Sequence, residues 1–323
     1  MRALLIVNPH ATSTTRGRRD VLVRALASAV DLEVVETRYR GDATRLASTA
    51  VSDKFGLVMT LGGDGTVNEA VNGLLGDSSQ PGGSQEPPPA PEDLPALAAL
   101  PGGNANVFTR SLGLPADPVE AAGRLIADLA AGNERQIGVG TANGRYFTFN
   151  AGLGLDAEVV RAVEGRRAAG RRLTPAMYAR TALGQYYRVT DRRSPAISIA
   201  EPAGFCASAV YTCIVSNSAP WTYLGSRPVF TSPDASFETG LDLLVLRSLG
   251  TVATARTLRQ MLTVRTRPPR GRSVLSGHDL PVIELRASRP VALQLDGEYV
   301  GEAEEVTFRS VPAALRVIGH APR

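Results

Sequence analysis

Apolar residues along the first 130 positions follow two alternating patterns. Strands are predicted at residues 4–7, 32–35, 55–61 and 97–100, and the continuous apolar run at residues 4–7 is typical of a strand buried on both faces of a sheet. Helical spacing of apolar residues fills the intervals at residues 16–30, 42–50 and 67–74. Repeated strand–turn–helix units predict an open, largely parallel α/β sheet that binds its ligand at the carboxyl ends of the strands.

After Gly132 the pattern changes to short segments with strand character. Strands are predicted at residues 145–150, 210–215, 241–246, 282–285, 291–295, 306–308 and 315–318. Helical patterns interrupt them at residues 155–164, 175–190 and 251–262. This order predicts a mostly antiparallel, β-sandwich-like second domain.

A length of 323 residues suits two domains at roughly 100–200 residues each. We place an α/β domain at residues 1–132, rejoined by residues 306–323, and a β-rich domain at residues 133–305. Residues 76–95 contain six prolines and predict a disordered surface loop within the first domain.

Composition excludes several classes of protein. No apolar stretch approaches the roughly 20 residues of a membrane-spanning helix, which excludes a helical integral membrane protein. Cys206 and Cys213 are the only cysteines, so neither a disulfide framework nor a four-thiolate zinc site is expected. The apolar run at residues 3–7 is too short for a secretory signal, and a reducing cytoplasm is therefore the expected compartment.

The net charge of +4 is unevenly distributed. Residues 158–193 carry nine arginines against three acidic residues, which leaves the rest of the chain slightly acidic. Local basicity of this kind indicates a docking face rather than a chain that coats nucleic acid. The ordinary alternative is a solvated helical face.

A glycine-rich motif follows the predicted strand at residues 55–61 and precedes a helix. Its residues are Gly62, Gly63, Asp64, Gly65 and Thr66. Glycines there let backbone N–H groups approach a phosphate, and the helix N-terminus adds partial positive charge. A carboxylate beside phosphate implies Mg²⁺, which Asp64 would hold through water. The alternative is a plain glycine turn, because Asp-Gly is also a hairpin signal, but the strand-to-helix context favours a phosphate site.

Other nucleotide-dependent classes lack their residues in this chain. Lys54 is the only lysine, and no Gly-Lys-Ser/Thr sequence occurs. P-loop NTPases and protein kinases both use a lysine on the phosphates, so both classes are excluded. No Gly-x-Ser-x-Gly nucleophile elbow is present either.

Four motifs follow one another along the chain. The first-strand loop is Asn8, Pro9, His10, Ala11 and Thr12, and the glycine-rich motif continues from Gly62, Gly63, Asp64, Gly65 and Thr66 into Val67, Asn68 and Glu69. The second motif runs from Pro101 to Phe108 and includes Asn104 and Asn106, and the C-terminal motif is Leu295, Asp296, Gly297 and Glu298. In this order they resemble the motifs of the diacylglycerol kinase and sphingosine kinase superfamily, in its bacterial soluble lipid kinase branch. In that resemblance the glycine-rich motif is the nucleotide motif, and Thr37 matches a nucleotide-contacting threonine.

This resemblance implies an ATP-dependent lipid kinase that needs Mg²⁺. The γ-phosphoryl group would pass to a lipid hydroxyl, with diacylglycerol giving phosphatidic acid as the leading case. Residues 1–132 would bind ATP through the motifs above, and residues 133–305 would bind the lipid. Glu298 would accept the hydroxyl proton and face Asp64 across a cleft between the domains. From spacing alone, Asp296-Gly297 is equally well a hairpin turn without chemistry.

Several positions depart from the family pattern: Asn104 replaces a threonine of the second motif, and Thr12 stands where glycine is common. Many bacterial members carry Asp where Val107 and Gly138 stand, in a water-bridged network around the active-site magnesium. The family's structural magnesium loop maps onto residues 236–241, with Ser236, Thr239 and Leu241 at ligand positions. Thr239 replaces an expected Asp, so a tight structural Mg²⁺ is not expected. An NAD kinase-like enzyme and a catalytically impaired nucleotide- or lipid-binding protein stay open as alternatives.

The arginine-rich segment suggests where such an enzyme would meet its substrate. Arginines interleaved with aromatic residues in 158–193 suit an anionic membrane surface, and would equally suit RNA. With the resemblance, we expect a cytoplasmic protein associated peripherally with the inner face of the membrane. No nucleic-acid partner is expected, and the resemblance is compatible with a homodimer.

Overall fold

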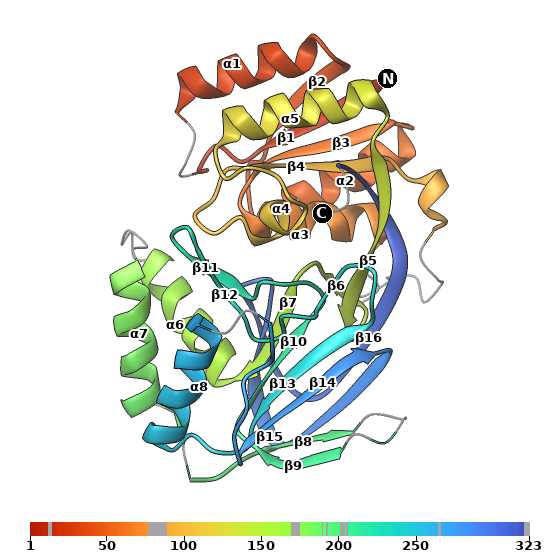
Figure 1. Cartoon of the computed structure of the whole chain (residues 1–323). Coiled ribbons are helices and arrows are strands. Elements are labelled where there is room, and N and C mark those ends of the chain that lie inside the picture. The colour runs from red at the N-terminus through yellow and green to blue at the C-terminus, as the bar shows by residue number, and fades with distance from the viewer. Residues whose placement is uncertain are drawn as a thin grey trace. The chain divides into compact units, whose positions relative to one another are not determined.

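The computed structural model divides the chain into two compact units (Figure 1). It describes residues 1–11, 15–76, 89–168, 175–188, 190–191, 193–200, 204, 206–263 and 266–319. The first unit comprises Met1–Val139, Gly144–Thr148 and Val311–Arg323, and the second comprises Gly140–Asn143 and Phe149–Ser310. Each unit is considered by itself below.

The first unit is built on parallel strands. In spatial order they are β4 (Ala96–Pro101), β3 (Leu57–Gly62), β1 (Arg2–Val7) and β2 (Asp31–Glu36), and the end of β16 (Glu298–Ile318) joins β4 in parallel. Every residue of β3 and β4 is buried, which explains why both strands read as unbroken apolar runs.

Helices cover both faces of this sheet (Figure 1). They are α1 (Arg16–Ala27), α2 (Asp42–Ser52), α3 (Asp64–Leu75), α4 (Val107–Ser111) and α5 (Pro118–Ala131). Leu22 and Leu26 of α1 and Leu125 of α5 pack into one core with Leu5 and Met59 of the strands. This core holds the strands in register, so that the loops at their carboxyl ends meet on one edge of the sheet.

The N-terminus of α2 is capped by a residue that is distant in the sequence. Asp42 is the first helical residue, and its carboxylate accepts from the backbone N–H of Arg38 at 2.8 Å. The orphan N–H groups of Gly41 and Ala43 instead donate to the Glu69 carboxylate of α3, at 2.8 and 3.2 Å. A residue 27 positions away therefore caps this helix, which local sequence patterns do not reveal.

The second unit is mostly antiparallel, as predicted. Its main strands, in spatial order, are β14 (Val274–Leu280), β13 (Leu241–Leu246), β10 (Thr212–Ser216), β7 (Asn150–Gly154), β15 (Val282–Leu295) and β16. Strand β8 (Ile197–Ala200) pairs with β15 and with β9 (Cys206–Val210), while β11 (Thr222–Leu224) and β12 (Arg227–Val229) form a separate pair. Its helices are α6 (Leu155–Ala168), α7 (Pro175–Arg188) and α8 (Thr251–Thr263). The predicted fold class, an α/β domain followed by an antiparallel strand-rich domain, is confirmed.

Several strands are longer or more numerous than the apolar pattern suggests. The predicted strand at 145–150 is two strands, β6 (Arg145–Phe147) and β7, and it follows β5 (Glu134–Ala142). Strand β16 spans 21 residues, but its first eight residues are half-buried or exposed, so only its middle, at residues 306–308, and its C-terminal end, at residues 315–318, were predicted. The proline-rich loop ends in a short 3₁₀ helix, η1 (Pro91–Asp93), and residues 77–88 of that loop lie outside the described residues.

No helix in the described part of the chain is long and apolar enough to cross a bilayer.

Candidate active site

The two glycine motifs of the first unit pack directly against each other. They follow the paired strands β3 and β4, and the Gly102 N–H donates to the Gly62 carbonyl at 2.7 Å. A Cβ atom on Gly102 would lie 2.8 Å from the Gly62 Cα, and one on Gly103 would lie 2.7 Å from the Gly63 Cα. These glycines are therefore required by backbone contact between the loops, whatever ligand the loops hold.

Asn8 ties the end of β1 to the same place. Its Nδ2 donates to the Thr66 Oγ1 at 3.3 Å, and its Oδ1 accepts from the His10 N–H at 2.9 Å. Thr66 itself fills the space beside Gly62, where an added Cβ would lie 2.5 Å from the hydroxyl oxygen. Loops from three neighbouring strands thus converge at one edge of the sheet, as the sequence predicted for a ligand site.

The second motif is shaped by Asn106. Its backbone is left-handed, with φ of 47°, and its buried side chain pairs with Gly103 in both directions. The Gly103 N–H donates to Oδ1 and Nδ2 donates to the Gly103 carbonyl, both at 2.8 Å. Asn106 therefore fixes the loop from within, while Asn104 lies exposed on it.

Asp64 links the two motifs at the start of α3. Its Oδ1 accepts from the Phe108 N–H, in the first turn of α4, at 3.1 Å. The N-terminus of α3 has no side-chain cap, and Gly63 precedes it in an extended conformation. An uncapped helix start that is flanked by close-packed glycines can accept a phosphate group through its N–H groups and its dipole.

The remaining residues of the nucleotide motif make contacts that hold helix α3 in place. Val67 and Asn68 are buried in α3, and the Asn68 Nδ2 donates to the Tyr146 carbonyl at 3.0 Å. Asn72, one turn later, pairs with both the N–H and the carbonyl of Tyr146. Together with the Glu69 cap on α2, these contacts hold α3 in place, so the motif anchors its own helix as well as shaping a loop.

The remaining predicted ligands lie around the ends of β1 and β2. Pro9 and His10 are exposed and Ala11 is half-buried. Thr37 is half-buried, and its N–H donates to the last residue of β1 at 2.9 Å. Thr12 lies outside the described residues. The positions that carry Asp in many family members are buried here, Val107 at the start of α4 and Gly138 in β5.

Glu298 belongs to the second unit, at the first position of β16. It pairs with Leu295 across a tight turn in which Asp296 and Gly297 both have positive φ, 50° and 78°. The hairpin predicted from Asp-Gly is therefore present. The expectation that Glu298 faces Asp64 stays a prediction.

Sequence reasoning missed a buried polar network behind this hairpin. Gln294 is 1% exposed and contacts Asn150 and Asp156 through its amide. Burial raises the pKa of the Asp156 carboxyl to about 6. One signal existed: Gln294 is the single polar residue in the apolar run at 291–295.

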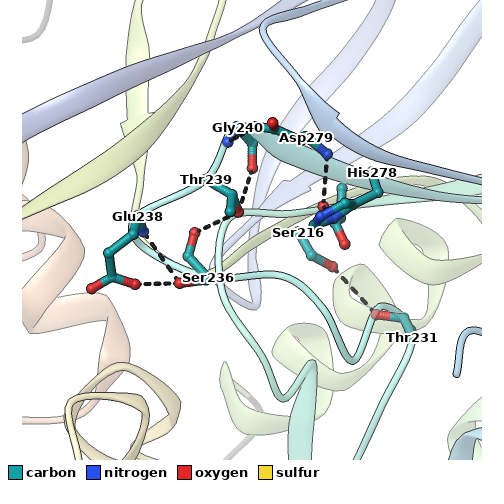
Figure 2. Close-up of polar contacts among 9 residues, drawn as sticks. Ser216, Thr231, Ser236, Glu238, Thr239, Gly240, His278 and Asp279 are labelled. Atoms are coloured by element: carbon teal, nitrogen blue, oxygen red, sulfur yellow. Dashed lines mark hydrogen bonds and ion pairs between the residues drawn. The ribbon is translucent and has the colours of Figure 1, made fainter. Parts of the chain in front are cut away.

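The loop that corresponds to the family's structural magnesium site is held by its own side chains (Figure 2). The Thr239 Oγ1 donates to the Ser236 carbonyl at 3.1 Å, Ser236 and Glu238 contact each other through their side chains, and the Gly240 N–H donates to the Asp279 Oδ1 at 2.6 Å. His278 contacts the buried Asp242 carboxylate at 2.7 Å.

Within the described residues, no three His, Cys, Asp or Glu side chains are grouped so that they could hold a metal ion. A hydroxyl donor stands where Mg²⁺ would need an anionic oxygen, and the Ser236 carbonyl is already occupied by it. These residues do not fit a tight structural Mg²⁺. Leu241, the third predicted ligand position, begins β13 and is buried.

The arginine-rich segment is only partly available as a docking face. Arg161 of α6 pairs with Glu302 at 2.8 Å, which neutralises it. On α7, Arg180 and Arg188 are exposed beside the exposed apolar side chains of Leu183 and Tyr187. Arg171, Arg172 and Arg192 lie outside the described residues.

Comparison with known proteins agrees with these motifs. Residues 2–142 match the family model for the diacylglycerol kinase catalytic domain. A diacylglycerol kinase of Bacillus subtilis is 28% identical over 93% of this chain and 90% of its own length. A "probable lipid kinase YegS-like" protein of Chromohalobacter salexigens is 36% identical, over 44% of this chain and 40% of its own.

The fold has solved counterparts as well. A crystal structure of "a putative diacylglycerol kinase" from Bacillus anthracis superimposes with a TM-score of 0.76 and 26% identity, over 99% of this chain and 97% of that one. In sequence and in fold, the chain is therefore similar to bacterial diacylglycerol kinases over nearly its whole length, and residues 2–142 match the catalytic domain of that family, which supports a lipid kinase enzyme.

Proposed function

We propose that the chain transfers the γ-phosphoryl group of ATP to the hydroxyl of a lipid alcohol, with diacylglycerol as acceptor and phosphatidic acid as product. One observation carries this proposal: loops from β1, β3 and β4 converge on the uncapped start of α3, where Asp64 joins the two glycine motifs. That arrangement suits a phosphate chain, and the family supplies the acceptor class.

The nucleotide would be held mainly by backbone groups. The N–H groups at the start of α3 would receive the phosphates, with Asn8 and Thr37 at the neighbouring strand ends. No lysine is needed in this scheme, which is consistent with a chain that has only Lys54.

Asp64 is the residue that would hold Mg²⁺, through water. Its Oδ1 accepts from the Phe108 N–H, which holds the carboxylate at the junction of the two glycine motifs. When bound, Mg²⁺ would neutralise charge on the phosphate oxygens. Val107 and Gly138 supply no carboxylate, so of positions 64, 107 and 138 only Asp64 offers an anionic group for the ion.

Glu298 would act as the general base. The lipid hydroxyl oxygen forms a bond to the γ-phosphorus, the bond from that phosphorus to the β,γ-bridging oxygen breaks, and ADP leaves. The hydroxyl proton passes to the Glu298 carboxylate. Phosphoryl transfer is mostly positioning and charge stabilisation, so one well-placed carboxylate is enough.

The enzyme would reach its substrate as a peripheral protein at an anionic membrane surface. Exposed Leu183 and Tyr187 on α7, flanked by Arg180 and Arg188, combine apolar insertion with positive charge. Each basic residue near such a surface contributes about 1 kcal/mol.

Radiolabelled ATP offered with a panel of acceptors tests the reaction. Diacylglycerol, ceramide, a sphingoid base and a prenyl alcohol are presented in mixed micelles, with and without Mg²⁺, and NAD⁺ serves as a soluble acceptor. We expect Mg²⁺-dependent label in phosphatidic acid. Label in NADP⁺ would instead support an NAD kinase, and ATP binding without transfer to any acceptor would support a binding protein.

Vesicle sedimentation tests the membrane contact. Binding should increase with anionic lipid content and decrease as salt shortens the Debye length from about 10 Å at 0.1 M to about 3 Å at 1 M. Arg180→Ser with Arg188→Ser should weaken binding, whereas Arg16→Ser with Arg24→Ser, two exposed arginines of α1, should not. Salt-insensitive binding, or RNA that displaces the vesicles, would contradict the proposal.

A further inference from the structure

The turn that presents Glu298 is not a free surface hairpin. Asp296, its first residue, is only 3% exposed. Its Oδ1 accepts from the N–H groups of Phe149 and Asn150, at 2.9 and 3.1 Å, and its own N–H donates to the Asn150 carbonyl at 2.8 Å. Three hydrogen bonds therefore attach the turn to the start of β7, within the same unit.

Gln294 holds the turn from the opposite side. Its Oε1 accepts from the Gly297 N–H at 2.8 Å, one residue before Glu298. Its Nε2 donates to the Asn150 Oδ1 at 2.9 Å and to the Asp156 Oδ2 at 2.8 Å. A single buried amide thus connects the backbone of the turn to β7 and to the first turn of α6.

The strand beside Gln294 is shaped to admit this contact. Gly152 pairs with Gln294 in the ladder between β7 and β15. A Cβ atom on Gly152 would lie 1.8 Å from the Asp156 Oδ2 and 2.8 Å from the Gln294 Nε2. The register between β15 and β16 also shifts between Leu293 and Gln294. The backbone at this place, with a glycine and an irregular strand register, is therefore adapted to the contact between Gln294 and Asp156.

A plain hairpin would need none of these groups. Asp-Gly closes a two-residue turn by its backbone preferences alone, and an apolar residue at position 294 would bury more favourably than an amide. The cost of burying Gln294 and Asp296 is offset only if their hydrogen bonds are all formed, and those bonds hold the turn in one conformation.

We propose that Gln294 and Asp296 are positioning residues that fix the Glu298 carboxylate for proton transfer from the lipid hydroxyl. This inference rests on the proposed function, in which Glu298 is the base. Neither residue needs to touch the substrate. A general base must lie within hydrogen-bond reach of its proton, and a displacement of about 1 Å can cost on the order of 100-fold in rate.

The proposal separates the acceptor role of Asp296 from its charge. Asp296→Ala removes the acceptor for Phe149 and Asn150, and we expect kcat on short-chain diacylglycerol to fall between about 10- and 100-fold with the KM for ATP unchanged. Asp296→Asn keeps the acceptor oxygen and should retain kcat within a few-fold. Equal loss in both variants would overturn the positioning role.

Gln294→Met provides a second route, because it keeps the length of the side chain while removing every hydrogen bond. It should lower kcat like Asp296→Ala, and it replaces that variant if Asp296→Ala does not fold. The matched control is Thr257→Val, which removes a buried hydrogen bond of α8 that has no connection to the hairpin. The control should leave kcat unchanged.

Combination with Glu298→Gln separates positioning from general damage. A residue that acts through Glu298 has nothing left to position in that background, so adding Gln294→Met or Asp296→Ala to Glu298→Gln should lower kcat no further. An additive loss would overturn the proposal. If Glu298→Gln alone keeps full activity, the base assignment fails instead, and the two failures are thereby distinguished.

Discussion

The glycine loops of the first unit and the Glu298 hairpin of the second hold their functional groups by different means. Around Asp64 the contacts join loops that follow adjacent strands, and the close-packed groups are largely backbone atoms of Gly62, Gly63, Gly102 and Gly103. Around Glu298 the contacts are made by the buried side chains of neighbouring strands and a helix. We propose that the first arrangement receives an anionic ligand, whereas the second holds one carboxylate in a fixed place.

The largest expected effect tests the first of these sites. Asp64→Asn keeps an acceptor for the Phe108 N–H, so the two glycine motifs should stay joined and the protein should fold normally. It removes the charge that would hold Mg²⁺, and we expect lipid phosphorylation to fall below detection. Radiolabel transfer and a thermal melt measure the two quantities. Measurable transfer by a well-folded variant would remove Asp64 from metal binding.

The next effect tests the second site. Glu298→Gln should bind ATP with unchanged affinity, because nucleotide binding is assigned to the first unit. Its kcat should fall by roughly two to four orders of magnitude, the usual size of general-base catalysis. ATP affinity is followed by calorimetry and kcat by radiolabel transfer. Near-normal turnover on a lipid acceptor would show that the base is another group.

This difference also explains what could be predicted from the sequence. Each of the two glycine motifs, Gly62–Thr66 and the loop after β4, is one continuous stretch of sequence that directly follows a strand. Their positions after these strands were therefore enough to place both motifs at one edge of the sheet. The Glu69 carboxylate that caps α2 accepts from N–H groups 28 and 26 positions away, and Gln294 contacts Asp156 at a separation of 138 positions. Strand pairing brings such partners together, and it cannot be predicted from any local pattern of residues.

Strand β14 is an example of the same limit in the fold. Its residues are half-buried or exposed, so no apolar run marked it, although it pairs with β13 over most of its length. By contrast, β3 and β4 of the first unit, which are buried on both faces, were easily recognised. Strands β8, β9 and β14 were missed because their backbone is paired while several of their side chains meet solvent, but β5 was missed although most of its residues are buried.

A pH titration of stability sharpens the comparison at Asp156. Because the pKa of this buried carboxyl is about 6 in the folded protein, above the ordinary 3.8, the folded state binds more protons than the unfolded chain between those values. Stability should therefore be greatest below pH 4 and fall as the pH rises to 6, by up to about 3 kcal/mol. Other titrating groups add their own dependence.

Asp156→Asn isolates this contribution by difference. Burial, and to a smaller extent the Asp156 charge, raises the pKa values of Tyr178 and Cys213, so both groups stay neutral throughout this range and should not contribute. Denaturant unfolding at pH 4, 5, 6 and 8 compares the variant with the wild-type protein. We expect the free energy of unfolding of the variant, relative to that of the wild-type protein, to increase as the pH rises. A difference that does not change with pH would contradict the raised pKa of Asp156.

A smaller effect distinguishes packing from ligand binding in the glycine loops. Gly102→Ala places a Cβ 2.8 Å from backbone atoms of Gly62, and overpacking of this kind costs about 1–3 kcal/mol. Gly123→Ala is the matched control, because nothing lies within 4 Å of its Cβ and alanine favours the helix α5 by up to about 1 kcal/mol. Denaturant unfolding without nucleotide measures both. Equal stability of the two variants would mean that the loops are not close-packed.

The smallest expected effect concerns the loop at residues 236–241, where the side chains of Ser236, Glu238 and Thr239 form hydrogen bonds within the turn. In the absence of nucleotide, Mg²⁺ and a chelator should leave the melting temperature of the wild-type protein unchanged, because Thr239 offers a hydroxyl donor where an anionic ligand is needed. Thr239→Asp supplies that carboxylate while Glu238 and Asp279 lie nearby in the loop's own contacts. At Mg²⁺ concentrations about fivefold above its Kd, the variant should gain about 1 kcal/mol. Thr239→Asn, which has the shape of the Asp variant without its charge, should gain no stability from Mg²⁺. A chelator that lowers the melting temperature of the wild-type protein would show that this turn binds a metal.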